Sequence, residues 1–442
     1  MPSSWETTTL GAVSNWLSGG TPKKGEPKYW GGDIPWISAN SMYGTRFSES
    51  ELRLTEAGLQ SGSRLAPKDT VLLLVRGGAL HKRIPVGIAT RDVAFNQDVK
   101  ALVAREDKIR PWYLLLWLLG MERHLLDSVV EYTGIGAGKL DTKRMHALEI
   151  QLPSLSEQDE IIAVVKSIDD RIELLHQTNT TLKSIAQALF KSWFVDFDPV
   201  RAKQAGRELE GMDAATAALF PAEFEESPLG LIPKGWRVCA LSELCESIFS
   251  GGTPDTRKPE YWNGTLPWFS SGETRETIVI GTEKHITEAA VLNSSTRLAR
   301  PGDVLIASAG QGLTRGQTSF CAIDTYINQS VVCVRTSQEL GSTAWTFYNL
   351  ARRYEELRGR SDSHSIRGSL TTKLLASLRV VAPPTSLMWS FGATAEHLLR
   401  AQAENRWRAS SLAQLRDTLL PRVISGKLRL PEAQEQLEDA LA

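Results

Sequence analysis

A stretch of 21 residues occurs twice in this chain, and this repeat limits the possible folds more than any other feature. Residues 18–38 read SGGTPKKGEPKYWGGDIPWIS and residues 250–270 read SGGTPDTRKPEYWNGTLPWFS, with 12 identical positions. If unrelated residues agree at roughly one position in fifteen, chance would give about one identical position in this stretch. The similarity continues, because Asn96-Gln97 recurs as Asn328-Gln329. LDTKRMHALEIQLPS (140–154) also matches LTTKLLASLRVVAPP (370–384). The chain is therefore an internal duplication.

Both copies show the same order of predicted elements. A Gly/Pro-rich turn is followed by short β-rich runs such as VLLLV (71–75) and VLIAS (304–308). A helical stretch comes next, at 111–126 and 343–358. This order predicts an α/β (α+β) fold class, with two globular domains that we call lobe one and lobe two.

A long helical pattern follows each lobe. Ser154 or Ser156 can cap the first helix, and Glu157 suits its first turn. About 38 residues would make a rod of about 57 Å. The second pattern is weaker, because Gln402 and Arg416 interrupt it. Spacings of four and three predict a coiled-coil seam of Ile161, Val165, Ile168, Ile172, Leu175, Asn179, Leu182 and Leu189 in the first helix, and of Leu398, Leu412 and Leu419 in the second.

We expect the two helices to pair antiparallel and to form a spacer between the lobes, which gives a pseudo-two-fold arrangement from one chain. Asn179, as a polar residue in the seam, is expected to fix the helix register. The polar tail is expected to lack a fixed structure. The predicted divisions are 1–153 for the first lobe, 154–195 for the first long helix, 196–232 for a connector, 233–383 for the second lobe, 384–430 for the second helix and C-terminal segment, and 431–442 for the tail.

The charge is uneven along the chain. The total over 442 residues is −1, but residues 1–150 and 233–382 are each +3 and residues 151–232 are −7. The apolar run Trp112–Leu119 is far shorter than the roughly 20 residues of a membrane span, and no signal peptide opens the chain. The four cysteines show no CxxC spacing. These features predict a cytoplasmic protein with reduced thiols, no membrane contact and no metal site.

Motifs for catalysis do not occur in the expected form. An amino-methyltransferase needs Asn or Asp before Pro-Pro and an aromatic residue, but Pro383-Pro384 lies between Ala382 and Thr385. TGIGAGKL (133–140) lacks the spacing and the hydroxyl of a nucleotide-binding loop. The seven histidines are scattered without a metal or catalytic pattern. We therefore expect no catalytic residues in this chain.

Two stretches have the composition of a DNA-contacting loop. Residues 71–91 contain basic residues and no acid, and residues 304–323 contain polar residues and no acid. Arginine and lysine suit guanine and phosphate, while glutamine suits adenine, so the two lobes should read different sequences. The alternative is a pair of solvated β-hairpin tips. The candidates are Lys23, Lys24, Arg76, His81, Lys82, Arg83 and Arg91 in lobe one, and Arg257, Lys258, Gln311, Thr314, Arg315 and Gln317 in lobe two.

The repeated phrase, together with LPSLSEQDEI (152–161), FDPVRAKQAG (197–206) and LLPRVISGKLRL (419–430), closely resembles the specificity subunit of type I restriction-modification enzymes. The resemblance covers nearly the whole chain, in order and twice. It implies a non-catalytic, sequence-specific DNA-binding subunit with two target-recognition domains, each reading one half of an asymmetric bipartite site on double-stranded DNA.

The resemblance also implies partners. The two long helices would bind two modification (adenine methyltransferase) subunits, to which restriction (endonuclease and translocase) subunits attach. S-adenosylmethionine, ATP and Mg are then expected in those subunits, and no cofactor in this chain. The second helix opens with PTSLMWSF (384–391) and lacks the Glu-Gln pair of SLSEQDEI (154–161), so either the two partner contacts differ or one copy has drifted.

Two other interpretations stay open. The chain could be a coiled-coil scaffold whose lobes bind protein partners only, or a methyltransferase that acts alone. Salt-sensitive binding to one bipartite site would separate the first interpretation from DNA recognition. Cofactor binding by the isolated chain would be required by the second.

Overall fold

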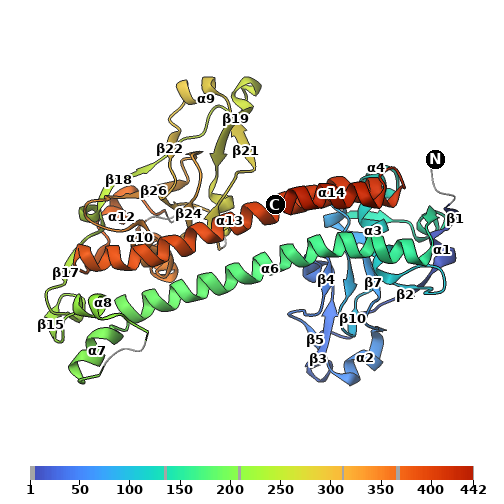
Figure 1. The fold of residues 1–442 in the computed structure, drawn as a ribbon, viewed down its shortest axis with the longest axis horizontal. Helices are drawn as coiled ribbons and strands as arrows, with labels where there is room; N and C mark the ends of the chain where they lie inside the picture. Colours follow the sequence, from blue (N-terminus) through green and yellow to red (C-terminus); the bar gives the residue numbers. More distant parts are fainter. Residues whose placement is uncertain (1–4, 134–136, 208–210, 311–312, 365–368, 442) are drawn as a thin grey trace. The chain divides into compact units, whose positions relative to one another are not determined.

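The computed structural model describes residues 5–133, 137–207, 211–310, 313–364 and 369–441. The chain forms two compact units. Unit one consists of residues 1–172 and 410–442, and unit two of residues 173–409. Two long helices, α6 (Leu155–Phe194) and α13 (Thr385–Ile424), each contribute one part to each unit (Figure 1). Mixed helix and sheet in both units agrees with the predicted fold class.

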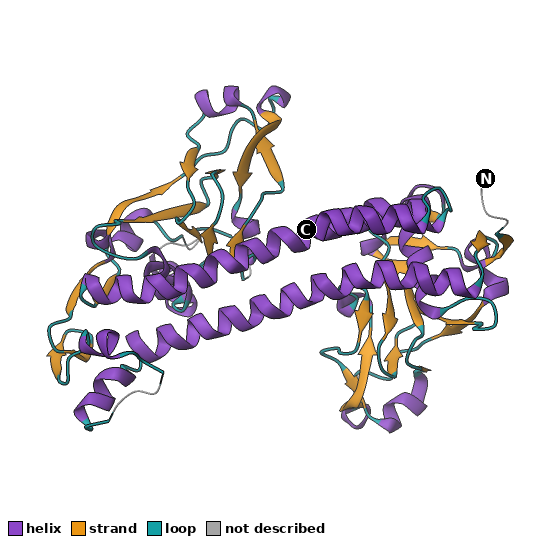
Figure 2. Cartoon of the chain, in the orientation of Figure 1, coloured by secondary structure: helices purple, strands orange, loops and turns teal. Residues whose placement is uncertain are grey.

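Lobe one contains a five-stranded sheet of order β2-β11-β7-β9-β4, a four-stranded sheet of order β5-β3-β10-β6, a three-stranded sheet of order β12-β13-β8 and the pair β1-β14 (Figure 2). Helix α3 packs on the five-stranded sheet. The strands are β1 (Glu6–Thr9), β2 (Ser14–Ser18), β3 (Trp30–Ile37), β4 (Arg46–Phe47), β5 (Arg53–Leu54), β6 (Leu65–Ala66), β7 (Val71–Leu74), β8 (Arg76–Gly77), β9 (Val86–Ala89), β10 (Val93–Phe95), β11 (Val99–Ala104), β12 (Val130–Thr133), β13 (Ala137–Leu140) and β14 (Glu149–Leu152). The helices are α1 (Leu10–Val13), η1 (Pro27–Tyr29), η2 (Ala39–Ser41), α2 (Glu56–Gly62), η3 (Gly78–His81), α3 (Pro111–Gly120), α4 (Glu122–Ser128) and α5 (Thr142–His146).

Lobe two repeats the first two sheets in the orders β18-β26-β23-β24-β20 and β21-β19-β25-β22, and repeats β1-β14 as β17-β27. Its strands are β17 (Arg237–Ala240), β18 (Cys245–Ser250), β19 (Trp262–Phe269), β20 (Ile278–Val279), β21 (Lys284–Ile286), β22 (Arg297–Ala299), β23 (Val304–Ala307), β24 (Thr318–Cys321), β25 (Thr325–Ile327), β26 (Val331–Thr336) and β27 (Arg379–Ala382). Its helices are η4 (Leu241–Leu244), η5 (Pro259–Tyr261), η6 (Ser271–Arg275), α9 (Glu288–Leu292), α10 (Thr343–Ala351), α11 (Tyr354–His364) and α12 (Thr372–Ala376). The duplication read from the sequence is therefore a duplication of fold.

The repeated phrase forms a scaffold in each lobe. The Trp36 indole nitrogen donates to the Gly20 carbonyl at 3.2 Å, and the Trp30 and Trp36 rings meet edge to face at 5.2 Å. Thr21 Oγ1 donates to Gln97 Oε1 at 2.6 Å, which joins the phrase to the repeated Asn-Gln pair. A Cβ on Gly19 would lie 2.2 Å from the Phe95 carbonyl oxygen, so only glycine fits there. Lobe two has the same contacts among Gly252, Thr253, Trp262, Trp268 and Gln329.

The two helix starts differ in the way they join their lobes. Ser154 caps α6, because its Oγ accepts from the Glu157 amide at 3.3 Å and Glu157 Oε2 accepts from the Ser154 amide at 3.0 Å. Gln158 is fully buried, accepts from the Arg110 amide at 2.8 Å and donates to the Lys108 carbonyl at 3.1 Å. In α13 the corresponding position is the buried, apolar Met388. The Glu-Gln pair is thus engaged within lobe one.

In unit one, the beginning of α6 packs beside the end of α13. Ile161 and Val165 are buried in one hydrophobic core with Leu419 and Ile424, and Ile168 is also buried. Arg416, which interrupts the predicted seam, donates from Nη1 to Asp169 Oδ1 at 2.8 Å, and the Asp169 side chain is 8% exposed. The interruption is therefore filled by an ion pair between the two helices.

In unit two, the end of α6 packs beside the beginning of α13, so the helices run antiparallel. Phe190 and Phe194 meet Phe391 edge to face, at 5.6 and 5.2 Å between ring centroids. Asn405 Nδ2 donates to Asn179 Oδ1 at 2.9 Å, and Asn179 Nδ2 donates to the Gln402 carbonyl at 3.1 Å. Of the predicted seam residues, Leu175 and Leu412 are buried, whereas Ile172, Asn179, Leu182, Leu189 and Leu398 are partly exposed.

The connector and the tail are both ordered in their described parts. The connector contains α7 (Asp198–Gln204), α8 (Ala214–Ala218) and the hairpin β15 (Phe224–Ser227) and β16 (Gly230–Pro233). The expectation of an unstructured tail was wrong. Residues Leu430–Leu441 form helix α14, in which Ala433 is buried in the core of unit one and Leu430 packs against that core, three positions apart on one helix face.

Candidate nucleic-acid interface

The candidate loop of lobe one, residues 75–84, follows strand β7 and is held from below by a β-hairpin. Arg76 of β8 pairs with Lys139 of β13, and the Leu80 side chain is fully buried. A Cβ on Gly138 would lie 2.7 Å from the Leu80 Cβ, so β13 approaches the loop closely. Arg76, His81 and Lys82 are exposed. The loop therefore presents its basic side chains to solvent on a fixed backbone.

Two exposed tyrosines flank this loop, and sequence reasoning missed both. Tyr132 is 54% exposed, and its ring stacks on His81 with 4.7 Å between centroids. Tyr43 is 74% exposed, and the Arg83 guanidinium lies 5.7 Å from its ring centroid. Arg83 also donates to the Met42 carbonyl at 2.9 Å. Neither tyrosine lies near the loop in sequence, so no local pattern marked them.

The other candidates of lobe one fall in two places. Lys23 and Lys24 are exposed on the turn between β2 and η1, where the Trp30 indole nitrogen donates to the Lys23 carbonyl at 3.2 Å. Arg91 follows β9, and since β9 runs antiparallel to β7, it lies at the opposite strand end from Arg76. Arg91 is paired with Glu49 at 3.4 Å. The structure thus does not bring Arg91 to the loop.

The candidate loop of lobe two, residues 308–317, contacts helix α11 through its described part. The Tyr354 hydroxyl donates to the Leu313 carbonyl at 2.7 Å and accepts from Arg358 at 2.7 Å. The Gly316 amide donates to the Ala307 carbonyl at 2.9 Å. Thr314 and Arg315 are partly exposed, and Gln311 lies outside the described residues.

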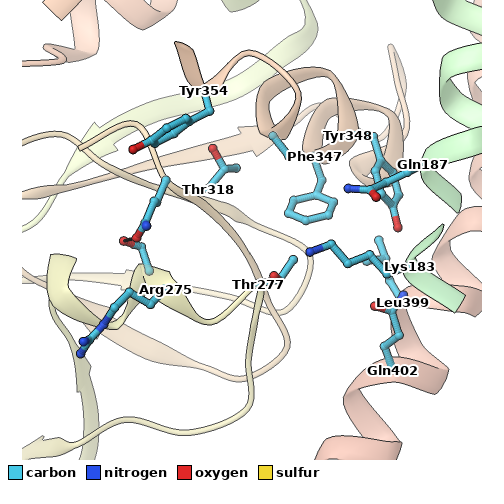
Figure 3. A pocket seen from close by; sticks show the side chains of 13 residues that line it. Lys183, Gln187, Arg275, Thr277, Thr318, Phe347, Tyr348, Tyr354, Leu399 and Gln402 are labelled. Atoms are coloured by element: carbon cyan, nitrogen blue, oxygen red, sulfur yellow. Dashed lines mark hydrogen bonds between the residues drawn. The ribbon is translucent and has the colours of Figure 1, made fainter. Parts of the chain in front are cut away.

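A pocket of about 220 Å³ lies within unit two, and Gln317 is one of its lining residues. Figure 3 shows Thr318 and Tyr354 on one side of it and Lys183 and Gln187 on another. Thr274 Oγ1 donates to Gln317 Oε1 at 3.3 Å. Lys183 and Gln187 of α6 line the pocket together with Tyr348 of α10. Burial raises the pKa of Tyr348 to about 12, so this phenol stays neutral. The loop is therefore backed by side chains of the long helix.

The turn of lobe two neutralises part of its own charge. Arg257 donates to both carboxylate oxygens of Asp255, each at 3.0 Å, and these bonds lower the pKa of Asp255 to about 2. Lys258 Nζ lies 5.0 Å from the Tyr261 ring centroid. Lys23 of lobe one occupies the position that corresponds to Asp255. The two turns therefore differ in net charge.

Burial raises the pKa of the Cys245 and Cys321 thiols to about 12, which keeps them protonated and weakly nucleophilic. Among the described residues, no group of three or more His, Cys, Asp or Glu side chains is placed to hold a metal ion. No described helix is long and apolar enough to cross a membrane.

The chain is thus a duplicated two-lobe protein in which a long helix follows each lobe and the two candidate loops differ in composition. The family described as the type I restriction modification DNA specificity domain matches residues 2–184 and 233–386. The chain belongs to this family.

Known proteins agree with this assignment over nearly the full length. The chain is 24% identical, over 98% of its length and 95% of the relative, to the type I restriction enzyme MjaIX specificity subunit of Methanocaldococcus jannaschii. It is 25% identical to the HindI specificity subunit of Haemophilus influenzae, over 72% of this chain and 78% of that one. The type I restriction-modification S subunit of M. genitalium has the same fold, with a TM-score of 0.59 at 14% identity over 95% of this chain and 96% of the other.

Proposed function

We propose that this chain is the DNA-reading subunit of a type I restriction-modification complex and that it recognises an asymmetric bipartite site, one half with each lobe. The observation that carries the proposal is the pair of loops at residues 75–84 and 308–317. They occupy corresponding places after β7 and β23, yet one presents Arg76, His81 and Lys82 while the other presents Thr314 and Arg315. Corresponding loops with different hydrogen-bonding groups suit two different half-sites.

In this proposal α6 and α13 hold two adenine methyltransferase subunits, and restriction subunits attach to these. Methyl transfer and cleavage then belong to the partners, which would carry S-adenosylmethionine, ATP and Mg. Membership in a family of DNA specificity domains supports this division of labour. The lobes supply the orientation of the complex on DNA, and phosphate contacts by Lys23 and Lys24 would fix its register.

A methylome tests the proposal. The chain is co-expressed with its methyltransferase subunit in a host without DNA methylation, and modified adenines are mapped by long-read sequencing. We expect one split motif with a fixed unspecified gap. A soluble complex that methylates no defined motif would overturn the proposal in favour of a scaffold that binds only proteins. Binding of S-adenosylmethionine by the isolated chain, measured by calorimetry, would contradict its non-catalytic role.

A further inference from the structure

An open hollow of about 460 Å³ lies on lobe one, along strands β2 and β11. It is separate from the loop residues described above. Its polar lining includes Asn15, Ser18, Lys100, Arg105 and His146. The carboxylates that follow in the turn, Glu106 and Asp107, do not line it.

The two cations of the hollow have neutral partners. Lys100 Nζ donates to Ser18 Oγ at 2.6 Å. Arg105 donates from Nε and Nη2 to Asn15 Oδ1 at 3.3 and 3.1 Å. Arg46 and Arg110 of the same lobe, in contrast, each contact an aspartate. Two positive charges without a carboxylate leave the hollow electropositive, and an anion would be attracted to it.

The floor of the hollow is built before any ligand arrives. The Trp16 and His146 rings are in contact, with 4.6 Å between centroids, and the Trp16 indole nitrogen donates to Ser14 Oγ at 3.0 Å. A Cβ on Gly11 would lie 2.8 Å from His146 Nδ1, so α1 and α5 approach closely at a glycine. Such preorganisation lowers the entropic cost of binding.

One end of the hollow opens at the strand ends that carry the candidate loop. Lys100 pairs with Leu73 of β7 on one side and with Ser18 of β2 on the other. Leu73 lies three residues before Arg76, and Ser18 precedes the turn with Lys23. The Lys100 end of the hollow therefore lies at the strand ends after which the candidate loop and the turn with Lys23 begin.

Lobe two lacks the corresponding charges. In its matching strands, Val332 lies opposite Ser250 and Ile248 takes the place of Trp16. Ser337 and Ala376 occupy the positions of Arg105 and His146. The arginine that β26 does carry, Arg335, is bound to Asp303 by two hydrogen bonds at 2.9 and 2.7 Å.

We infer that the hollow with Lys100 and Arg105 binds phosphates of the DNA backbone and anchors lobe one to DNA regardless of sequence. The inference rests on the proposed function and adds an asymmetry to it, because lobe two has no such anchor at the corresponding strands. Backbone contacts of this kind contribute affinity and salt dependence but carry no direct sequence information.

Fluorescence anisotropy of the chain assembled with its methyltransferase subunit tests this inference. Binding is measured on two duplexes, one with the cognate site and one without, from about 50 to 400 mM salt. The salt slope is the slope of the logarithm of the binding constant against the logarithm of the salt concentration. Each lost phosphate contact should lower its magnitude by about 0.9, so the double variant Lys100→Ala, Arg105→Ala should lower it by about 2. Affinity at low salt should fall roughly tenfold, equally on both duplexes.

The control variants separate charge from fold. Arg105→Lys should keep the slope, because it keeps the charge. Lys68→Ala, in an exposed position before β7 and at the strand end away from Lys100, should also leave the slope unchanged. A double variant with the wild-type melting temperature and the wild-type slope overturns the inference. The inference is also overturned if the double variant weakens assembly with the methyltransferase subunit and leaves DNA binding unchanged. That result would identify an acidic protein segment as the ligand of the hollow. Failure of the wild-type complex to prefer any bipartite site would instead count against the proposed function.

Discussion

Lobe one and lobe two have the same framework and hold their candidate loops in different ways. The loop of lobe one rests on the hairpin β12-β13, with Leu80 buried beneath β13. The loop of lobe two is attached to α11 through the hydrogen bond from Tyr354 to the Leu313 carbonyl. Helix α11 of lobe two covers the segment that corresponds to α4 and β12 of lobe one.

The difference shows which parts of a duplicated fold are free to change. The scaffold contacts of Trp36 and Trp268 recur, because they close the same sheet and turn in both lobes. The segments after α3 and α10 differ in their described residues, because lobe one continues from α4 into strand β12 whereas lobe two continues in helix α11. The two candidate loops therefore differ both in the side chains that they expose and in the elements that contact them.

Exchange of a whole lobe should have the largest effect. If residues 1–150 are replaced by the corresponding lobe of a homologous subunit, one half of the recognised site should change completely and the other half should stay the same. Methylome sequencing of the chimaera measures this directly. A change in both halves would show that the lobes do not read independently.

The helix starts offer a second way to test the comparison. Gln158→Met gives lobe one the residue of lobe two, but leaves the Arg110 amide and the Lys108 carbonyl without their partner. We expect the free energy of unfolding to fall by about 2–4 kcal/mol. Urea unfolding followed by tryptophan fluorescence measures it. Met388→Leu is a volume-conserving control at the start of α13 and should cost less than about 1.5 kcal/mol. Equal losses of stability in the two variants would show that the two helix starts do not differ in the way described.

The polar contact between the helices of unit two should be worth less. Asn179→Leu removes the hydrogen bonds to the Asn405 side chain and to the Gln402 carbonyl and should cost about 1–2 kcal/mol. Asn179→Leu combined with Asn405→Leu should recover most of this loss, because two leucines can pack at the seam. A double-mutant cycle by chemical denaturation gives the coupling, and an additive loss would rule out a direct contact.

The smallest effect is expected at the support of the second loop. Tyr354→Phe removes one hydrogen bond to the loop backbone and should cost about 1 kcal/mol. Its consequence for selectivity should be confined to the half-site of lobe two, where base preference relaxes. Methylation assays on single-base variants of the site measure this. Tyr132→Phe in lobe one is the matched control, and relaxation of the first half-site by Tyr354→Phe would contradict the assignment.

Much of the fold could be predicted from the sequence, because a repeat and a helical period are local patterns. The duplication, the long helices and the antiparallel pairing follow from such patterns. Arg416 shows where this fails, since a charged residue in an apolar seam looks like a defect until its partner Asp169 is known. The helical tail was missed because its apolar side chains gain stability only by packing on unit one.

The candidate site could be predicted only in part. Arg76, His81 and Lys82 follow one another in sequence, so a composition count finds them. Tyr132 reaches the loop through a strand pairing of distant segments. Lys100 and Arg105 meet their partners Ser18 and Asn15 only because β11 pairs with β2. Arg91 has the right residue type but lies at the wrong strand end. Residue type is local information, whereas juxtaposition depends on sheet register.

The discontinuous composition of unit one has a consequence for the newly made chain. Its core includes Ile161 and Val165 from the first half of synthesis and Leu419 and Ile424 from the very end. Residues 173–409 are translated in between, which takes on the order of ten to fifty seconds at about 5–20 residues per second. During that interval the apolar face at the beginning of α6 is not yet covered by the end of α13. A ribosome that stops before residue 410 releases a product without its closing segment, a natural substrate for chaperones and proteases.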